Sequence, residues 1–298
     1  MSEEISPFTG RRHGLQRLCH ILNQPRSTIY TRRARLAAGP PDPPLKRRGP
    51  QPKMTDTSLT QAIREDLNTT LFTGEGHRKV WSRLRLAGIR VSRDRVLRLM
   101  RENHWLSPHR CRQGTPQLHT GTITTQAPDL MWGTDGVRVE TVDEGWVWIF
   151  CAVDHFNAEC IGWHVAKIGS RFAALEPLAQ GLTRYFGGTG AEAARGLTLR
   201  FDHGTQYMSD HFLNQLRFWG IAISPAFVAE PQTNGVAERF NRTLKEQAIQ
   251  GRVFRNLLEL RMAVADFVDR YNAHWRLEKL GYLTPLEARQ SATIRQVA

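Results

Sequence analysis

Cysteine is scarce in this chain of 298 residues, with four in all and no C-x-x-C pair among them. A chain of this length needs no disulfide framework to hold its core, so we expect free thiols. Long apolar runs are missing too. The longest runs from Trp146 to Val153, too short to span a bilayer, and the first residues lack the apolar segment of a signal peptide. These absences argue against a disulfide-stapled secreted scaffold and a membrane-spanning protein, and we expect a cytoplasmic one.

Acidic residues are few in the first part of the chain. Residues 1–130 carry 23 Lys and Arg against 10 Asp and Glu, whereas residues 131–298 carry 18 of each, so the whole net charge of +13 lies in the N-terminal part. A charge kept only for solubility would have no reason to be confined to one part. We therefore favour a nucleic-acid-binding module joined to a neutral part with another task.

Helical periodicity fills this basic part. Residues 1–38 predict a short helix-turn-helix-like segment, which a plain amphipathic hairpin would explain equally well. Residues 39–58 form a linker rich in proline and basic residues. Residues 59–110 predict three short helices, the last one beginning after Ser92 as N-cap and carrying Arg93, Arg95 and Arg98 on its outer face. This pattern favours a helix-turn-helix DNA-binding domain over a small bundle with a solvated arginine face.

A different pattern follows a second linker, residues 111–130. Alternating and apolar segments predict three antiparallel strands, the first beginning near residue 132 and alternating through residue 141, the others at residues 146–153 and 161–166. Helices and strands alternate after them: helix 172–185, strand 197–201, helix 209–219, a short strand 221–224, and helices 236–250 and 257–272. Residues 131–298 should therefore form an α/β domain, a mixed sheet covered by helices.

Three acids in this domain could form a metal site. Asp202 directly follows a strand pattern, Asp135 lies in the first strand, and Glu238 lies on a helical pattern with 35 residues between it and Asp202. If the two strands are neighbours, their carboxylates meet at one edge and Glu238 can complete the cluster. A single Asp at a strand end is more often a turn residue. The set of three favours a metal site.

Clustered carboxylates repel one another, so such a cluster is stable chiefly with cations present. Ligation by oxygen alone favours Mg²⁺ or Mn²⁺ over zinc. Two such ions can activate an attacking oxygen and stabilise the leaving one in a displacement at phosphorus. Displacement at phosphorus is chemistry that acts on DNA, and it therefore agrees with the DNA-binding module predicted in the N-terminal part.

Residues 131–298 resemble the catalytic core of retroviral integrases and of the bacterial insertion-sequence transposases that share it. Asp135, Asp202 and Glu238 match the family's three metal-binding acids, including the 35-residue gap. Three further motifs resemble the family's D-x-G-x-x-Y, the start of its catalytic helix and its C-terminal signature: Asp202-His203-Gly204-Thr205-Gln206-Tyr207, Pro231-Gln232-x-Asn234-Gly235-x-x-Glu238 and Leu280-Gly281-Tyr282-x-Thr284-Pro285. The resemblance implies a ribonuclease-H-like fold.

The same resemblance points to residues that hold DNA. Lys245 stands seven positions after Glu238, on the same helical face, where family members carry a Lys or Arg that contacts DNA near the scissile phosphate. For Arg242 two interpretations stay open, a phosphate contact and simple solvation. Residues 77–107 are similar to the second helix-turn-helix of the split-frame insertion-sequence transposases, and residues 15–35 to the start of their second frame.

Two features depart from the family pattern. Retroviral integrases carry an N-terminal His-His-Cys-Cys zinc domain, and the His and Cys residues of this chain do not have that spacing, so we expect no zinc. In the C-terminal signature, Trp275-Arg276-Leu277-Glu278 replaces the usual Arg-Pro-His before Leu-Gly-Tyr. This replacement puts in doubt the DNA contact of the missing His, unless His274 substitutes for it.

The resemblance therefore implies a DNA transposase of the split-frame insertion-sequence type. It would use the three acids and two Mg²⁺ or Mn²⁺ ions to cleave at mobile-element ends, then transfer strands by direct attack of a 3′-hydroxyl on a phosphodiester. Its expected partners are double-stranded DNA, both terminal inverted repeats and target, and further copies of itself, with an upstream-frame protein as another candidate and no membrane. We expect it in the cytoplasm of a bacterium, at the nucleoid.

Two alternatives stay open from the sequence. A non-catalytic DNA-binding regulator derived from a transposase would use the basic part alone. A ribonuclease-H-like nuclease would share the acids but need no helix-turn-helix.

Overall fold

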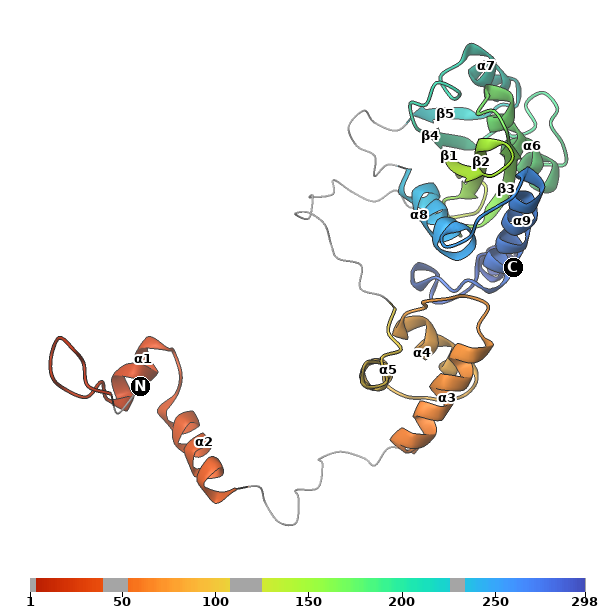
Figure 1. Ribbon diagram of the computed structural model, residues 1–298. Coiled ribbons are helices and arrows are strands. Elements are labelled where there is room, and N and C mark those ends of the chain that lie inside the picture. The colour runs from red at the N-terminus through yellow and green to blue at the C-terminus, as the bar shows by residue number, and fades with distance from the viewer. Residues whose placement is uncertain (1–3, 40–52, 108–124, 226–233, 298) are drawn as a thin grey trace. The chain divides into compact units, whose positions relative to one another are not determined.

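The structure is a computed structural model that describes residues 4–39, 53–107, 125–225 and 234–297 (Figure 1). Most of both predicted linkers lies outside the described residues, as do His109, Cys111, Pro231 and Gln232. The chain separates into two compact units, Met1–Thr55 and Asp56–Ala298. The finer domain boundaries expected from the sequence stay predictions.

The first unit contains two short helices, α1 (Leu15–Ile21) and α2 (Arg26–Ala38). Helix α1 buries only Cys19, and α2 buries none of its side chains within this unit. The exposed face of α2 carries several arginines and no acid. Such a helix gains little stability from packing, and its charge suits contact with a polyanion.

The second unit begins with a helical module, residues 56–107, made of α3 (Asp56–Thr69), α4 (His77–Leu86) and α5 (Arg93–Glu102). Its small core is apolar and is formed by Leu59, Ile63, Val80, Leu84, Val96, Leu99 and Met100. The hydroxyl of Ser92 accepts a hydrogen bond from the amide of Arg95, which confirms the predicted N-cap. Helices α4 and α5, joined by a short turn, have the arrangement of a helix-turn-helix.

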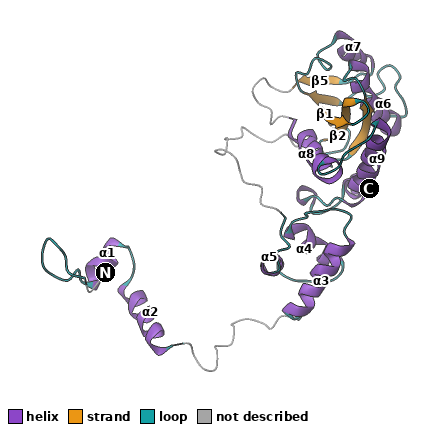
Figure 2. Ribbon diagram, in the orientation of Figure 1, coloured by secondary structure: helices purple, strands orange, loops and turns teal. Residues whose placement is uncertain are grey.

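The α/β domain that follows is built on a five-stranded sheet in the order β3-β2-β1-β4-β5 (Figure 2). Strand β1 pairs antiparallel with β2 and parallel with β4, β3 pairs antiparallel with β2, and β5 pairs parallel with β4. The strands are β1 (Met131–Thr141), β2 (Gly145–Asp154), β3 (Cys160–Ala166), β4 (Thr198–Phe201) and β5 (Ala222–Pro225). The predicted fold class, a ribonuclease-H-like mixed sheet flanked by helices and preceded by helical modules, is confirmed.

Helices cover both faces of this sheet, so each face has its own apolar core. One core joins the sheet to α6 (Arg171–Tyr185) and α7 (Asp210–Phe218), and the other joins it to α8 (Gly235–Leu244) and α9 (Leu257–His274). Side chains alternate along β1: Trp132 belongs to the first core, Val137 and Val139 to the second. Asp135 has the parity of Val137, and it therefore lies on the face that α8 covers.

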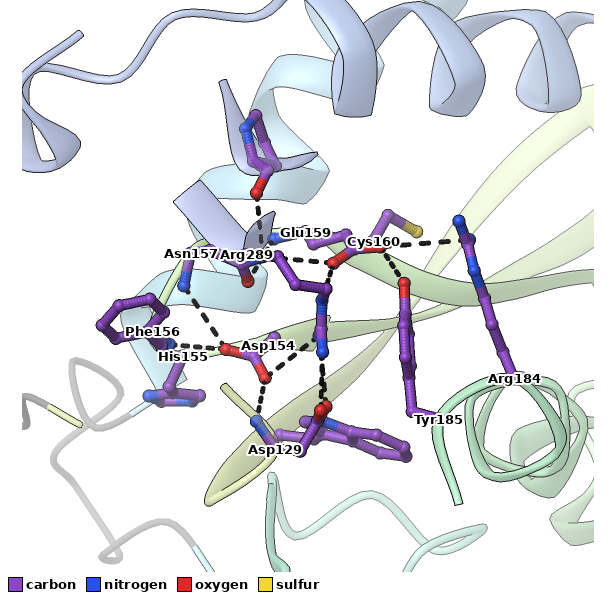
Figure 3. A network of polar contacts seen from close by, with 12 residues as sticks. Asp129, Asp154, His155, Phe156, Asn157, Glu159, Cys160, Arg184, Tyr185 and Arg289 are labelled. Carbon is purple, nitrogen blue, oxygen red and sulfur yellow. Dashed lines mark hydrogen bonds and ion pairs between the residues drawn. The ribbon is translucent and has the colours of Figure 1, made fainter. Parts of the chain in front are cut away.

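The C-terminal helix α10 (Pro285–Val297) is held by a buried ionic cluster around Arg289 (Figure 3). Its guanidinium pairs with Asp129 at 2.5 Å, with Asp154 at 3.6 Å and with Glu159. The hydroxyl of Tyr185 donates to Glu159 as well. Asp154 also closes a turn, since it accepts from the amide of Phe156 at 2.7 Å. The cluster thus connects α10 to the end of β2 and the start of β3.

Within the described ranges, no helix combines the length and the apolar character needed to cross a membrane.

Candidate active site

The first two acids lie side by side because β1 and β4 are neighbouring parallel strands. The last paired positions of these strands are Gly133 and Arg200. Asp135 and Asp202 each lie two residues further along the chain. Parallel strands advance together, so the two carboxylates reach the same edge of the sheet. The negative charge of Asp202 accordingly helps to raise the pKa of Asp135.

Asp135 is mostly buried and is held by two hydrogen bonds. Its Oδ2 accepts from Nδ2 of Asn241 at 2.9 Å, and its Oδ1 accepts from the amide of Gly136 at 2.8 Å. Burial raises the pKa of Asp135 above its usual value, while these bonds and the charge of Lys245 act in the opposite direction. The side chain is therefore oriented, and it is in a setting where a nearby cation would stabilise the ionised form.

Asp202 is exposed and closes the turn that follows β4. Its Oδ1 accepts from the amide of Gly204 at 2.9 Å. A Cβ atom on Gly204 would lie 2.6 Å from Nε2 of Gln206 and 3.0 Å from Oδ1 of Asp202, so a side chain there would displace the ends of these two side chains. Tyr207 is fully buried among Phe150, Phe201 and Phe212, and it anchors the end of the turn. The turn closed by Asp202 and the burial of Tyr207 account for the Asp and Tyr positions of the D-x-G-x-x-Y pattern.

Glu238 lies in the first turn of α8 and faces the two aspartates. Partial burial raises the pKa of Glu238, and the charges of Asp135 and Asp202 raise it further. The helix is fixed in rotation by Phe240, which packs against Phe267 and Tyr271 of α9. Because Phe240 faces the core, Glu238 and Asn241 are directed toward the edge where β1 carries its acid.

An open groove of about 380 Å³ runs along this edge. Three acids line it together with two basic residues, namely Asp135, Glu238, Glu246, Arg242 and Lys245, whereas Asp202 is not among its lining residues. Acids and cations side by side are suited to a metal-bound phosphate, since the acids can hold the ion and the cations the phosphate oxygens.

Helix α8 ends at Leu244, and a π-helix follows it over Lys245–Ile249. The prediction of one continuous helix over residues 236–250 is therefore wrong in its last turn. A π-helix closes i→i+5 hydrogen bonds and is often found at functional sites. Lys245, the first residue of this segment, remains exposed beside the groove.

The three acids supply only oxygen ligands, and this donor set fits Mg²⁺ or Mn²⁺. Among the described residues, however, no three His, Cys, Asp or Glu side chains are close enough to hold an ion as they stand. Besides burial, the charge of Asp202 raises the pKa of Asp135, and the charges of Asp135 and Asp202 raise the pKa of Glu238; a bound cation would relieve this repulsion. The assignment of the three acids as metal ligands stays a prediction.

Models of known protein families match both the helical module and the domain built on the five-stranded sheet. Two family models, each described as "Integrase core domain", match residues 125–231 and 219–285, and a third, "HTH-like domain", matches residues 75–113. The chain is 28% identical over 226 residues to the transposase for insertion sequence element IS629 of Shigella sonnei, covering 72% of this chain and 74% of that protein. It is 27% identical to a putative transposase for IS986/IS6110 of Mycobacterium tuberculosis, covering 71% of this chain and 80% of that protein.

The chain belongs to the insertion-sequence transposases with an integrase-like catalytic core. It is a DNA transposase, hence a polynucleotidyl transferase, and the comparisons favour neither the non-catalytic regulator nor the ribonuclease-H-like nuclease.

Solved integrase structures are more distant from this transposase. The chain is 16% identical to the HTLV-2 integrase catalytic core domain in complex with magnesium, with a TM-score of 0.41, covering 55% of this chain and 98% of that one. To a chain of the simian T-cell lymphotropic virus intasome in complex with PP2A regulatory subunit B56 gamma it is 17% identical, with a TM-score of 0.47 and 70% of each chain covered.

The arginines predicted to bind DNA through the transposase's helical module are engaged by acids of the chain itself. Asp56, at the start of α3, accepts from Arg95 at 2.8 Å and from Arg98 at 2.6 Å. Arg93 lies 4.0 Å from Glu278 of the catalytic domain. None of the three lines the groove at the acids. Their role in DNA binding stays a prediction.

Sequence reasoning missed Asn241, which orients Asp135. Its signal was present, because Asn241 follows Glu238 by three residues and so shares its helical face. The periodicity could not show which strand that face meets.

Proposed function

We propose that this transposase cleaves DNA at the ends of a mobile element and joins the freed 3′-hydroxyl to target DNA, with Asp135, Asp202 and Glu238 holding two Mg²⁺ or Mn²⁺ ions. The β1–β4 register supports this proposal most directly, because it sets Asp135 and Asp202 side by side with Glu238 facing them. Ions held there would supply activation of the attacking oxygen and charge stabilisation at the leaving one.

The chain's own residues have separate tasks in this proposal. Asn241 and the amide of Gly136 keep the Asp135 carboxylate directed into the groove. Lys245 and Arg242, on the groove wall, hold the phosphate that carries the scissile bond. Double-stranded DNA is bound mainly by the basic N-terminal part, since residues 131–298 carry no net charge.

The protein is also proposed to act as a homo-oligomer on two element ends. An upstream-frame protein remains a candidate partner.

Asp202→Asn tests the proposal. The variant should bind terminal-repeat DNA like the wild type, because the affinity comes from elsewhere, and should lose Mg²⁺-dependent cleavage and strand transfer. Activity is measured with labelled oligonucleotides that carry an element end, and affinity by gel shift. Asp210→Asn, an exposed acid in the first turn of α7, is the matched control and should keep full activity. Strand transfer by the Asp202→Asn variant would show that the assignment is wrong.

A further inference from the structure

An aromatic contact joins the helical module to the C-terminal part of the catalytic domain. Phe72, in the loop between α3 and α4, is 5% exposed and packs edge-on against Trp275, with ring centroids 4.8 Å apart. Trp275 directly follows α9 and stacks on Tyr271 of that helix. The ammonium of Lys79, from α4, lies over the face of Trp275. The tryptophan is thus enclosed between the module and its own domain.

Backbone groups of the same loop are bound by side chains of the catalytic domain. The amide of Thr73 donates to Oε1 of Gln247 at 3.0 Å, and Nε2 of Gln247 donates to the carbonyl of Thr73 at 2.9 Å. Nη1 of Arg270 donates to the carbonyl of Leu71 at 2.8 Å. Gln247 lies in the π-helix, two residues after Lys245. The loop is therefore fixed to the element that continues the catalytic helix α8.

One carboxylate reaches both helices of the helix-turn-helix pair. Glu278 accepts from Nη1 of Arg78 on α4 at 2.5 Å and lies 4.0 Å from Nη1 of Arg93, the first residue of α5. These exposed ion pairs alone contribute little to stability. Together with the buried aromatic contact and the backbone hydrogen bonds, they define one orientation of the recognition helix α5.

We infer that Trp275 and Glu278 are positioning residues, which hold the helix-turn-helix at a fixed offset from the catalytic acids and so decide which phosphate is cut. The inference builds on the proposed cleavage of element ends. Residues 71–79 are the docked segment, and the surface formed by Gln247, Arg270, Trp275 and Glu278 receives it. A bound repeat then presents one phosphodiester at Asp135 and Asp202, because recognition helix and groove belong to one rigid arrangement.

The test compares the full-length wild type with Trp275→Ala and Glu278→Gln on DNA that carries a terminal repeat. Cut positions are mapped at single-nucleotide resolution, and affinity is measured by gel shift. The wild type should cut one phosphate. Both variants should keep their affinity within about threefold yet cut neighbouring phosphates as well, with cleavage at the correct one reduced about tenfold or more, because small misplacements of a substrate lower the rate strongly. Wild-type cut positions and rates in both variants would overturn the inference.

Two further sets of variants separate positioning from general damage. Trp146→Ala is the control for Trp275→Ala, and Glu140→Gln is the control for Glu278→Gln. Both replace an exposed residue in the first hairpin of the sheet, and both variants should cut DNA like the wild type. Phe72→Ala and Gln247→Ala should reproduce the scattered cutting without changing Trp275. A thermal melt of each variant shows whether it is folded.

Amide hydrogen exchange tests docking without any cleavage. In the wild type the amide of Thr73 should be protected, and Gln247→Ala or Trp275→Ala should accelerate its exchange by about tenfold or more. Unprotected exchange at residues 71–79 in the wild type would refute docking, even if DNA is cut. Protection combined with a complete lack of cleavage by the wild type would instead refute the proposed function and leave docking in place.

Discussion

At the scale of single residues, the site depends on how Asp135 is held. The carboxylate is largely buried beside a second acid; burial raises its pKa, and two hydrogen bonds act against this rise and orient the side chain. Asn241 supplies one of these bonds from the helix that also carries Glu238. Its contribution is therefore electrostatic as well as geometric.

Asn241→Ala should move the pH dependence of the reaction. The hydrogen bond from Asn241 lowers the pKa of Asp135, so its loss raises that pKa, and the acidic limb of the pH–rate profile should move to higher pH. Mg²⁺-dependent cleavage measured between pH 5 and 9 tests this. Asn214→Ala, on α7, is the control with an exposed amide. An unchanged acidic limb would mean that Asp135 does not limit the rate.

His155 makes a separate prediction about stability. It is 5% exposed, and neither ring nitrogen has a hydrogen-bond partner among the described residues. Burial lowers the pKa of His155 from 6.5 to about 4. As the pH falls, His155 is therefore protonated in the unfolded chain before it is protonated in the folded one. His155 thus lowers the free energy of unfolding as the pH falls from 6.5 to 4.

His155→Gln should abolish this loss. When the pH falls from 7 to 5, the free energy of unfolding of the wild type should decrease by about 2 kcal/mol more than that of the variant. Urea unfolding at both pH values measures it. The comparison must be between the two proteins, because the raised pKa of Asp154, about 6 owing to its burial, acts in the opposite direction in both. A constant difference would contradict the prediction.

At the scale of elements, α10 depends on one side chain. Burial alone would lower the pKa of Arg289, but its hydrogen bonds and ion pairs with Asp129 and Glu159 raise it, so the guanidinium stays charged inside the protein. The partners Asp154 and Glu159 are fully buried. Ionic clusters of this kind fix one arrangement because each member needs the others.

Arg289→Met should lower the free energy of unfolding by about 3–5 kcal/mol, because it leaves buried carboxylates without a counter-charge. Chemical denaturation followed by far-UV circular dichroism measures this loss. Arg184→Ala is the matched control, since Arg184 lies 3.9 Å from the same Glu159 but is 53% exposed. It should change the stability by less than about 0.5 kcal/mol. If both variants lost the same stability, burial of the Arg289 ion pairs would not be the cause of the loss.

At the scale of the whole molecule, the N-terminal unit is strongly basic and is a separate compact unit from the rest of the chain. Residues 1–55 carry 11 Lys and Arg against 3 Asp and Glu, yet they form a compact unit separate from Asp56–Ala298. Their contribution to DNA binding should therefore be mostly electrostatic and independent of the stability of the rest.

Removal of residues 1–55 should weaken DNA binding and make it less dependent on salt, because fewer counterions are released. The melting temperature of the remaining unit should stay unchanged. Gel shifts between 50 and 200 mM salt and a thermal melt test the two halves of this prediction. A large drop in the melting temperature would mean that the two units stabilise each other.

The sequence by itself determined most of the helices and strands, and it predicted the three acids of the candidate site. These predictions rest on patterns that can be recognised in the sequence without knowledge of the packing. Examples are the alternation along the strands, the N-cap at Ser92 and the 35-residue gap between Asp202 and Glu238. The mixed sheet followed from them as well, since three hairpin-like strands and alternating helices have few ways to pack.

Only the tertiary structure decided which side chains meet. The contact of Asn241 with Asp135 joins residues 106 positions apart, and the pairing of Arg289 with Asp129 joins residues 160 positions apart. The engagement of Arg95 and Arg98 by Asp56 and the end of α8 at a π-helix also depend on packing between elements. Periodicity gives the face of a helix on which a residue lies, but the strand, loop or acid opposite that face is chosen by the packing of the whole chain.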